Sequence, residues 1–308
     1  MSAPIRIGTR ASKLALAQAQ MLRDTLASAH GLPAEALEIV PMTTAGDREV
    51  QKDPAHWGFK GLFTKELEDA LLEGRVDVAV HSMKDMPSVL HERLTLAAML
   101  PRADVRDAWI STQHASYAAL PAGAVVGTSS TRRAAQLRHR HPQVQIVPFR
   151  GNVQTRLQKL ADGVAEATFL ACAGLSRLGM REWLHNPIAT ELMLPAVAQG
   201  AIGMECRRDD ARMQALLAPL DHLPTSICVA AERAFLRVLD GSCRTPIAGL
   251  ATLDGDRLTL QAEVLSLDGS VRHAHLLSGT VTDAIAIGEA VGAILHEAAG
   301  PQLLESWK

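Results

Sequence analysis

Aromatic side chains are scarce in this chain of 308 residues, of which only 3% are Phe, Trp or Tyr. Its cores must therefore be built mainly from Ala, Leu, Val and Ile, which an apolar content of 47% allows. No apolar run approaches the roughly 20 residues that a membrane-spanning helix needs. The start at Met1 leads directly into a strand-like segment without the apolar stretch of a signal peptide, so we expect a cytoplasmic protein that binds no membrane.

Metal and nucleotide motifs are also missing. The four cysteines (Cys172, Cys206, Cys228 and Cys243) are far apart and form no C-x-x-C pair, which argues against a zinc site and a disulfide framework. No G-x-G-x-x-G follows the first strand-like segment, and the glycines of 58–63 lack the spacing of a phosphate-binding loop. We therefore expect no metal and no dinucleotide.

Positive charge, by contrast, is concentrated in one stretch. The whole chain is nearly neutral, with 31 Lys and Arg against 33 Asp and Glu. The stretch 128–156 has no lysine and no acid, and its six arginines are Arg132, Arg133, Arg138, Arg140, Arg150 and Arg156. Four of them lie beside serine, threonine or glycine turns that follow apolar runs. Helix N-termini and arginine forks both favour anions, so this stretch predicts a ligand with several negative groups.

Two plainer interpretations of these arginines compete with a small polyanion. Arg138 and Arg140 fit an ordinary solvated helix face. Nucleic acid also attracts basic patches, but the near-neutral total charge and the lack of interleaved aromatic residues disfavour it.

Apolar periodicity divides the chain into two regions. Strand and helix signals alternate through the first two-thirds, which predicts a mostly parallel α/β sheet. Within it, Thr64 is expected to cap a helix that runs to about residue 73. The last third has a helix, three strand-like runs joined by the turn dipeptides Asp254-Gly255 and Asp268-Gly269, and a closing helix. We expect it to form an α+β module.

Two loop residues are candidates for chemistry. Asp85 follows the strand-like segment 76–80, where open α/β sheets bind ligands, and with Lys84 beside it can act as an acid, a base or a cation stabiliser. Cys243 precedes Arg244 in a loop, the setting of a reactive thiolate. Taken alone, these positions favour a solvated turn for Asp85 and a buried loop cysteine for Cys243. Phe59 and Phe63 are two of only five phenylalanines, and one of them is a candidate to stack on a flat ligand.

Taken together, these segments closely resemble the hydroxymethylbilane synthase family, also called the porphobilinogen deaminases. The resemblance runs from Ile5 to about Gly249 and keeps the family's order. Its motifs are RIGTRAS at 6–12, LALAQ at 14–18, GLFTKELE at 61–68, DVAVHSMKD at 77–85, GTSS at 127–130, RR at 132–133, RGNV at 150–153, TRL at 155–157, AGLSRLG at 173–179, QGA at 199–201 and ERAFL at 232–236.

The resemblance implies a particular reaction. Enzymes of this family join four porphobilinogen molecules head to tail, release four ammonia molecules and hydrolyse the product to 1-hydroxymethylbilane. They prime the reaction with a dipyrromethane cofactor, which a cysteine holds through a thioether. By resemblance, Cys243 is that cysteine. Asp85 is the catalytic aspartate, which protonates the leaving amine and stabilises the azafulvene cation and the positive pyrrole nitrogens.

The resemblance also assigns binding roles, because every pyrrole ring carries an acetate and a propionate. The residues implied to hold the cofactor are Lys84, Asp85, Thr128, Ser129, Ser130, Arg132 and Arg133. The residues implied to bind substrate and the growing chain are Arg10, Ser12, Gln18, Phe63, Arg150, Arg156, Arg177, Gln199 and Gly200. Of these, Phe63 would cover the site.

The implied fold has two α/β domains like those of periplasmic binding proteins, plus a small C-terminal α+β domain. We expect the first domain at 1–100 and 200–218, the second at 101–199, and the third, with the cysteine loop, at 219–308. Gln199 and Gly200 would lie at a hinge, and the protein would be a monomer. The alternative is a non-enzymatic small-polyanion-binding protein of the same two-domain fold, which would need the arginines but neither Asp85 nor a modified Cys243.

Three positions depart from the family pattern. Thr131 stands where an apolar residue is usual, and Ala198 and Ser242 stand where glycine is usual. Because residues other than glycine resist positive φ, we expect the loop at Ser242 to be either compatible or slightly strained. None of the three removes a charged or nucleophilic group, so the expected activity stands.

Overall fold

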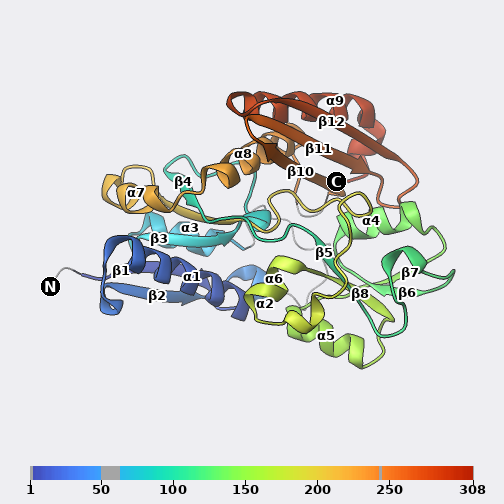
Figure 1. The fold of residues 1–308 in the computed structure, drawn as a ribbon, viewed down its shortest axis with the longest axis horizontal. Coiled ribbons are helices and arrows are strands. Elements are labelled where there is room, and N and C mark those ends of the chain that lie inside the picture. Colours follow the sequence, from blue (N-terminus) through green and yellow to red (C-terminus); the bar gives the residue numbers. More distant parts are fainter. Residues whose placement is uncertain (1–2, 50–62, 243–244, 308) are drawn as a thin grey trace. The chain divides into compact units, whose positions relative to one another are not determined.

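The computed structural model describes residues 3–49, 63–242 and 245–307, which form two compact units (Figure 1). The first unit comprises Met1–Arg102 and Ala201–Ser226, and the second comprises Ala103–Gly200 and Ile227–Lys308. The expected division into three domains stays a prediction.

The first unit is built on a five-stranded sheet with the strand order β2-β1-β3-β9-β4. The strands are β1 (Ile5–Arg10), β2 (Leu37–Met42), β3 (Val78–Ser82), β4 (Leu94–Met99) and β9 (Ile202–Arg207). β1 runs parallel to β2 and β3, whereas β9 runs antiparallel to β3 and β4. The carboxyl ends of β1 and β3 therefore lie at the same edge of the sheet.

Helices cover both faces of this sheet. Apolar residues of α1 (Lys13–His30) and α7 (Ala211–Leu217) share one core with alternate residues of the strands. α3 (Lys65–Leu72) packs against the other face through Leu67 and Leu71. The remaining short helices of the unit are η1 (Ala34–Ala36), α2 (Ala45–Glu49), η3 (Met83–Asp85) and η6 (Ala218–Leu220).

The second unit begins with a four-stranded sheet of order β5-β8-β6-β7. Its strands are β5 (Asp107–Ser111), β6 (Val125–Gly127), β7 (Gln145–Val147) and β8 (Ala167–Ala171). α4 (Thr131–Arg140) packs through Leu137 on one face, and α5 (Val153–Ala161) and α6 (Cys172–Arg177) pack on the other. The short helices η4 (Tyr117–Ala119) and η5 (Arg181–Trp183) lie in its connections.

The C-terminal part of the second unit is an antiparallel meander with helices. Its elements are α8 (Leu223–Val238), β10 (Ile247–Asp254), β11 (Arg257–Leu265), β12 (Arg272–Thr280), η7 (Val281–Asp283) and α9 (Ala284–Glu305). α9 packs on β11 and β12 (Figure 1). Gly288 lets α9 approach α8 closely, because a β-carbon at this position would lie 2.2 Å from the carbonyl oxygen of Ala231.

These elements confirm the expected fold class, two α/β sheets and a small α+β part. The prediction of a mostly parallel sheet holds only in part, because four of the seven strand pairings described in these two sheets are parallel. β9 and β4 in the first unit, and β5 in the second, add antiparallel pairs that strand–helix alternation does not reveal. Thr64 is the N-cap residue of α3, as predicted, but its hydroxyl makes no capping hydrogen bond and is buried without a partner among the described residues.

Candidate functional site

Asp85 lies just past the carboxyl end of β3, in the single turn η3. The neighbouring Lys84 side chain is exposed, and Asp85 is half-buried. No described residue forms a hydrogen bond or an ion pair with the Asp85 carboxylate, unlike the carboxylates of Asp47 and Asp77 in the same unit, which pair with arginines. The Asp85 carboxylate thus lies at the edge of the sheet, and no described residue occupies its oxygen atoms. Both properties suit an acid or a cation stabiliser.

Gln18 and Ser12 reach the same edge of the sheet from α1. Gln18 is buried, and its Nε2 donates to the Oγ of Ser82, the last residue of β3, at 2.8 Å. Ser12 caps α1 by accepting the Ala15 amide at 3.3 Å. Both predicted substrate residues therefore also hold local structure at the strand ends.

Arg10 and Phe63, two more predicted substrate residues, are in contact. The guanidinium of Arg10 lies 4.3 Å from the ring centroid of Phe63 and forms a bidentate pair with Asp47. Burial alone would raise the pKa of Asp47, but the hydrogen bonds and charge of Arg10 outweigh it and lower that pKa. Arg10 is thereby fixed at the end of β1.

In the second unit, the turn after β6 is fastened by its own hydroxyl groups. Thr128 Oγ1 accepts the Ser130 amide at 3.2 Å, and Ser129 Oγ accepts the Phe149 amide at 2.8 Å. Ser130 caps α4 by accepting the Arg133 amide at 3.4 Å. Ser129 is exposed, so part of this turn faces solvent at the start of α4.

Arg132 and Arg133, in the first turn of α4, are buried and share one carboxylate. The Nη2 atoms of both arginines lie 2.7 Å from oxygens of Asp107, the first residue of β5. Arg132 also donates to the Leu194 carbonyl at 2.6 Å, and Arg133 to the Phe169 carbonyl at 3.0 Å. Burial opposes ionisation of Asp107, but the two arginines outweigh it and hold its pKa well below the usual range.

Asp107 is a site residue that sequence reasoning missed. Its only sequence signal is an acid at the start of the apolar run Ala108–Ile110, where a lone carboxylate would be buried without a partner. The partners are 25 and 26 positions away, beyond the reach of any local pattern.

The other predicted arginines of this unit take different settings. Arg156, in α5, donates its Nε proton to the Gly151 carbonyl at 2.8 Å, and Arg150 is half-buried just before that turn. Arg177, at the end of α6, donates to the Gly200 carbonyl at 2.5 Å. Its Nε is buried without a partner among the described residues, and burial lowers the pKa of Arg177 to about 10.

Gln199 connects the end of this segment to the arginine pair. Its Nε2 donates to the Val105 carbonyl at 2.8 Å and to Asp107 Oδ1 at 2.9 Å. Gly200 has a φ of +89°, and Ala198, where the family usually has glycine, has a φ of +59°. The departure at Ala198 therefore places an alanine in the left-handed region, whereas Ser242 is not among the described non-glycine residues with positive φ.

Cys243 lies outside the described residues, but its flanks are described. Thr245 Oγ1 accepts the Ser242 amide at 2.9 Å and donates to the Ser242 carbonyl at 2.7 Å. Thr131, the first residue of α4, donates from Oγ1 to the Thr245 carbonyl at 3.4 Å. The residue two positions after Cys243 is thus in contact with the helix that carries Arg132 and Arg133.

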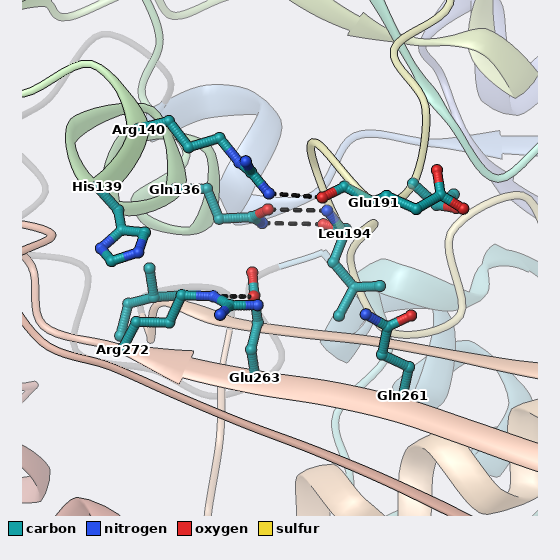
Figure 2. Close-up of a pocket in the computed structure, with 10 residues that line it drawn as sticks. Gln136, His139, Arg140, Glu191, Leu194, Gln261, Glu263 and Arg272 are labelled. Atoms are coloured by element: carbon teal, nitrogen blue, oxygen red, sulfur yellow. Dashed lines mark hydrogen bonds and ion pairs between the residues drawn. The ribbon is translucent and has the colours of Figure 1, made fainter.

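A small polar cavity lies elsewhere in the second unit, between the later part of α4 and β11 (Figure 2). Gln136, Glu263 and Arg272 line it, and none of the predicted site residues does. Among the described residues, no group of three His, Cys, Asp or Glu side chains is placed to hold a metal ion. No described helix has the length and apolar character needed to cross a membrane.

Comparison with known proteins gives two family matches. Residues 5–215 match the family model described as porphobilinogen deaminase, dipyromethane cofactor binding domain, and residues 226–297 match porphobilinogen deaminase, C-terminal domain. Two similar relatives are a porphobilinogen deaminase of Paracoccus denitrificans and a chloroplastic one of Pisum sativum. The first is 57% identical over 92% of this chain and 91% of its own length. The second is 50% identical over 99% of this chain and 84% of its own length.

Solved structures show only weaker likenesses. The methionine binding protein MetQ is 13% identical, with a TM-score of 0.45 over 70% of this chain and 89% of its own. A VFT2 domain of Bordetella pertussis BvgS is 14% identical, with a TM-score of 0.40 over 75% and 91%. TM-scores as low as these do not establish a relationship. The two family models and the two relatives do establish one, and the chain belongs to the porphobilinogen deaminase family.

Proposed function

We propose that the chain condenses four porphobilinogen molecules head to tail and hydrolyses the product to 1-hydroxymethylbilane, with Asp85 as catalytic residue and a dipyrromethane cofactor on Cys243. Family membership supplies the reaction: the chain is a transferase of tetrapyrrole biosynthesis with a dipyrromethane-cofactor domain. It also disfavours a non-enzymatic polyanion binder. The thioether at Cys243, a monomeric state, a cytoplasmic location and the absence of a nucleic-acid partner belong to the proposal.

The donors at the start of α4 fit a polycarboxylate cofactor. Arg132 uses two of its five N–H groups, and Arg133 three, in bonds to described residues, so both keep donors for a further anion. Two guanidinium groups on the single carboxylate of Asp107 leave positive charge in excess in a buried place. The proposal rests mainly on this excess positive charge. It begins at Arg132, next to Thr131, whose hydroxyl contacts Thr245 of the cysteine loop.

The remaining residues then have defined tasks. When bound, the cofactor supplies the terminal pyrrole to which the first porphobilinogen molecule is joined. Arg132 and Arg133, with Lys84 and the hydroxyl groups of 128–130, would hold its carboxylates. The arginines at positions 10, 150, 156 and 177, together with Ser12, Gln18, Gln199 and Gly200, would bind the carboxylates of substrate and product, and Phe63 would cover the substrate.

Asp85 would carry the proton chemistry. As the carbon–nitrogen bond of porphobilinogen breaks, the Asp85 carboxyl gives its proton to the departing nitrogen, which leaves as ammonia. The resulting carboxylate then faces the positive charge that develops on the pyrrole, and such fixed opposite charge is an effective form of catalysis. This role is supported by the lack of a hydrogen-bond or ion-pair partner for the Asp85 carboxylate among the described residues.

The intact mass of the purified protein tests the cofactor assignment. We expect a mass increase equal to two linked pyrroles in the wild type and none in Cys243→Ser. Cys228→Ser, which removes a buried cysteine that the proposal does not use, is the matched control and should keep the increase. An unmodified wild type that stays inactive with porphobilinogen would refute the proposal.

Turnover of Asp85→Asn tests the catalytic assignment. The amide cannot deliver the proton, and general acid catalysis is worth about 100- to 10,000-fold, so turnover should fall by at least about 100-fold. Asp69→Asn, on the exposed side of α3, should keep normal turnover. Turnover of Asp85→Asn within a few-fold of the wild type would remove Asp85 from the proposed mechanism.

A further inference from the structure

We propose that Asp107 is the positioning residue of the cofactor site, which holds the Arg132 and Arg133 guanidinium groups in the orientation that receives cofactor carboxylates. The inference rests on the proposed function, because that function assigns the cofactor to these two arginines. It adds a residue outside every motif by which the chain resembles its family.

The Asp107 carboxylate is saturated by side chains of its own unit. Oδ1 accepts from Arg133 Nη2 at 2.7 Å and from Gln199 Nε2 at 2.9 Å. Oδ2 accepts from Arg132 Nη2 at 2.7 Å and from Arg133 Nε at 3.2 Å. A carboxylate offers about four acceptor positions, so none remains for a ligand. Asp107 therefore acts through the arginines and does not touch the cofactor itself.

The geometry fixes each arginine in more than one direction. Arg133 binds Asp107 through Nε and Nη2, the two-bond arrangement that sets the plane of a guanidinium, and its Nη1 is held by the Phe169 carbonyl. Arg132 is held between Asp107 and the Leu194 carbonyl. Both side chains are about 95% buried, so water cannot readily replace these hydrogen bonds.

The segment that contributes Leu194 and Gln199 is itself fastened. Gln136, one turn after Arg132 in α4, exchanges two hydrogen bonds with the backbone of Leu194 at 2.8 and 2.9 Å (Figure 2). Glu232 of α8 accepts the amides of Ala198 and Ala251. The carboxylate of Asp107 thus joins the arginine pair to a segment anchored independently at both ends.

Asp107→Asn is the direct test. The amide replaces one acceptor oxygen by a donor that faces guanidinium N–H groups, so the arginines lose their fixed orientation while the volume is kept. The protein is produced in cells that make no porphobilinogen, porphobilinogen is then added, and the two-pyrrole mass increase is followed in time. Displacement of positioned groups by about 1 Å costs up to roughly 100-fold in rate, and we expect uptake to slow by that order.

Two comparisons separate positioning from general structural damage. Glu263→Gln also changes a buried carboxylate of the same unit, one that pairs with Arg272, and should cost stability but leave uptake at the wild-type rate. Asp107→Glu keeps the charge but shifts it by one methylene, so a positioning role predicts slow uptake in a protein whose near-ultraviolet circular dichroism is native. This variant decides the matter if Asp107→Asn does not fold.

Wild-type uptake rates in folded Asp107→Asn or Asp107→Glu would overturn the inference and leave the proposed function intact. A wild type that takes up no pyrroles would instead overturn the proposed function.

Discussion

A guanidinium N–H group that is buried without a partner is costly to a folded protein, and the half-buried Arg177 has such a group. Its Nε is buried and unpartnered among the described residues, and burial lowers its pKa to about 10, so it is still charged at neutral pH. Replacing a buried charge by an apolar side chain of similar size is often neutral or stabilising. In the proposed function, this charge binds a pyrrole carboxylate.

Arg177→Met should separate binding from stability. We expect the free energy of unfolding in urea to stay the same or rise, because a buried charge is removed. The KM for porphobilinogen should rise about 10- to 100-fold, the value of one lost charge-assisted hydrogen bond. Arg181→Met, at an exposed position nearby, should change neither quantity. A large loss of stability with an unchanged KM would show that Arg177 is a structural residue.

At this scale, the sequence indicated the types of site residue but not their partners. The arginines were found because six of them fall in one short stretch without acids. Asp107 was not found, because its three partners lie 25 to 92 positions away and only folding brings them together. The strain at Ala198 was not anticipated either. Its left-handed φ is reached while Glu232 accepts its amide at 2.5 Å, a contact across 34 positions.

At the scale of elements, the close approach of α8 and α9 depends on two glycines of α9, Gly288 and Gly292. Glycine inside a helix costs about 1 kcal/mol relative to alanine, so helix propensity alone favours Gly288→Ala. The added β-carbon would lie 2.2 Å from the Ala231 carbonyl oxygen and 2.8 Å from the Ala234 side chain, and backbone cannot easily move away. Packing and propensity therefore predict opposite signs for this substitution.

We expect packing to decide the effect of Gly288→Ala. Overpacking of a close contact costs about 1–3 kcal/mol, so the free energy of unfolding should fall. Ala293→Gly, on the exposed side of the same helix, is the control and should cost about 1 kcal/mol through propensity alone. If Gly288→Ala were stabilising, the two helices would be farther apart than they are here.

Elements were predictable where periodicity is strong. The helix signal from Leu14 to Leu26 and the closing helix correspond to α1 and α9, and the two Asp-Gly dipeptides join β10, β11 and β12. Strand direction was not predictable, because β9 returns to the first sheet after about a hundred residues of the other unit. A local pattern carries no information about which edge such a strand joins.

At the scale of the whole molecule, each unit contains carboxylates held ionised by arginines. Burial works against ionisation at Asp47, Asp77 and Asp107, but their arginine partners outweigh it and lower the pKa of each. In the unfolded chain these carboxyls have a pKa near 3.9. Since the folded values are lower, the stability they contribute is complete above about pH 4 to 5 and is lost as the pH falls through the folded pKa values.

The acid limb of the stability curve should therefore depend on Asp107. Below about pH 4, Asp107 binds a proton in the unfolded chain but not in the folded one, which contributes a slope of about 1.4 kcal/mol per pH unit. Asp107→Asn removes this group. The free energy of unfolding of this variant in urea, measured from pH 3 to 7, should be lower than that of the wild type at pH 7 and fall less steeply below pH 4. Asp268, an exposed carboxyl whose pKa Ser266 and Ser270 lower to about 2, is the control. Asp268→Asn should flatten the curve less, because solvent screens an exposed group. Equal acid slopes for the wild type and Asp107→Asn would mean that the arginine pair does not hold Asp107 ionised.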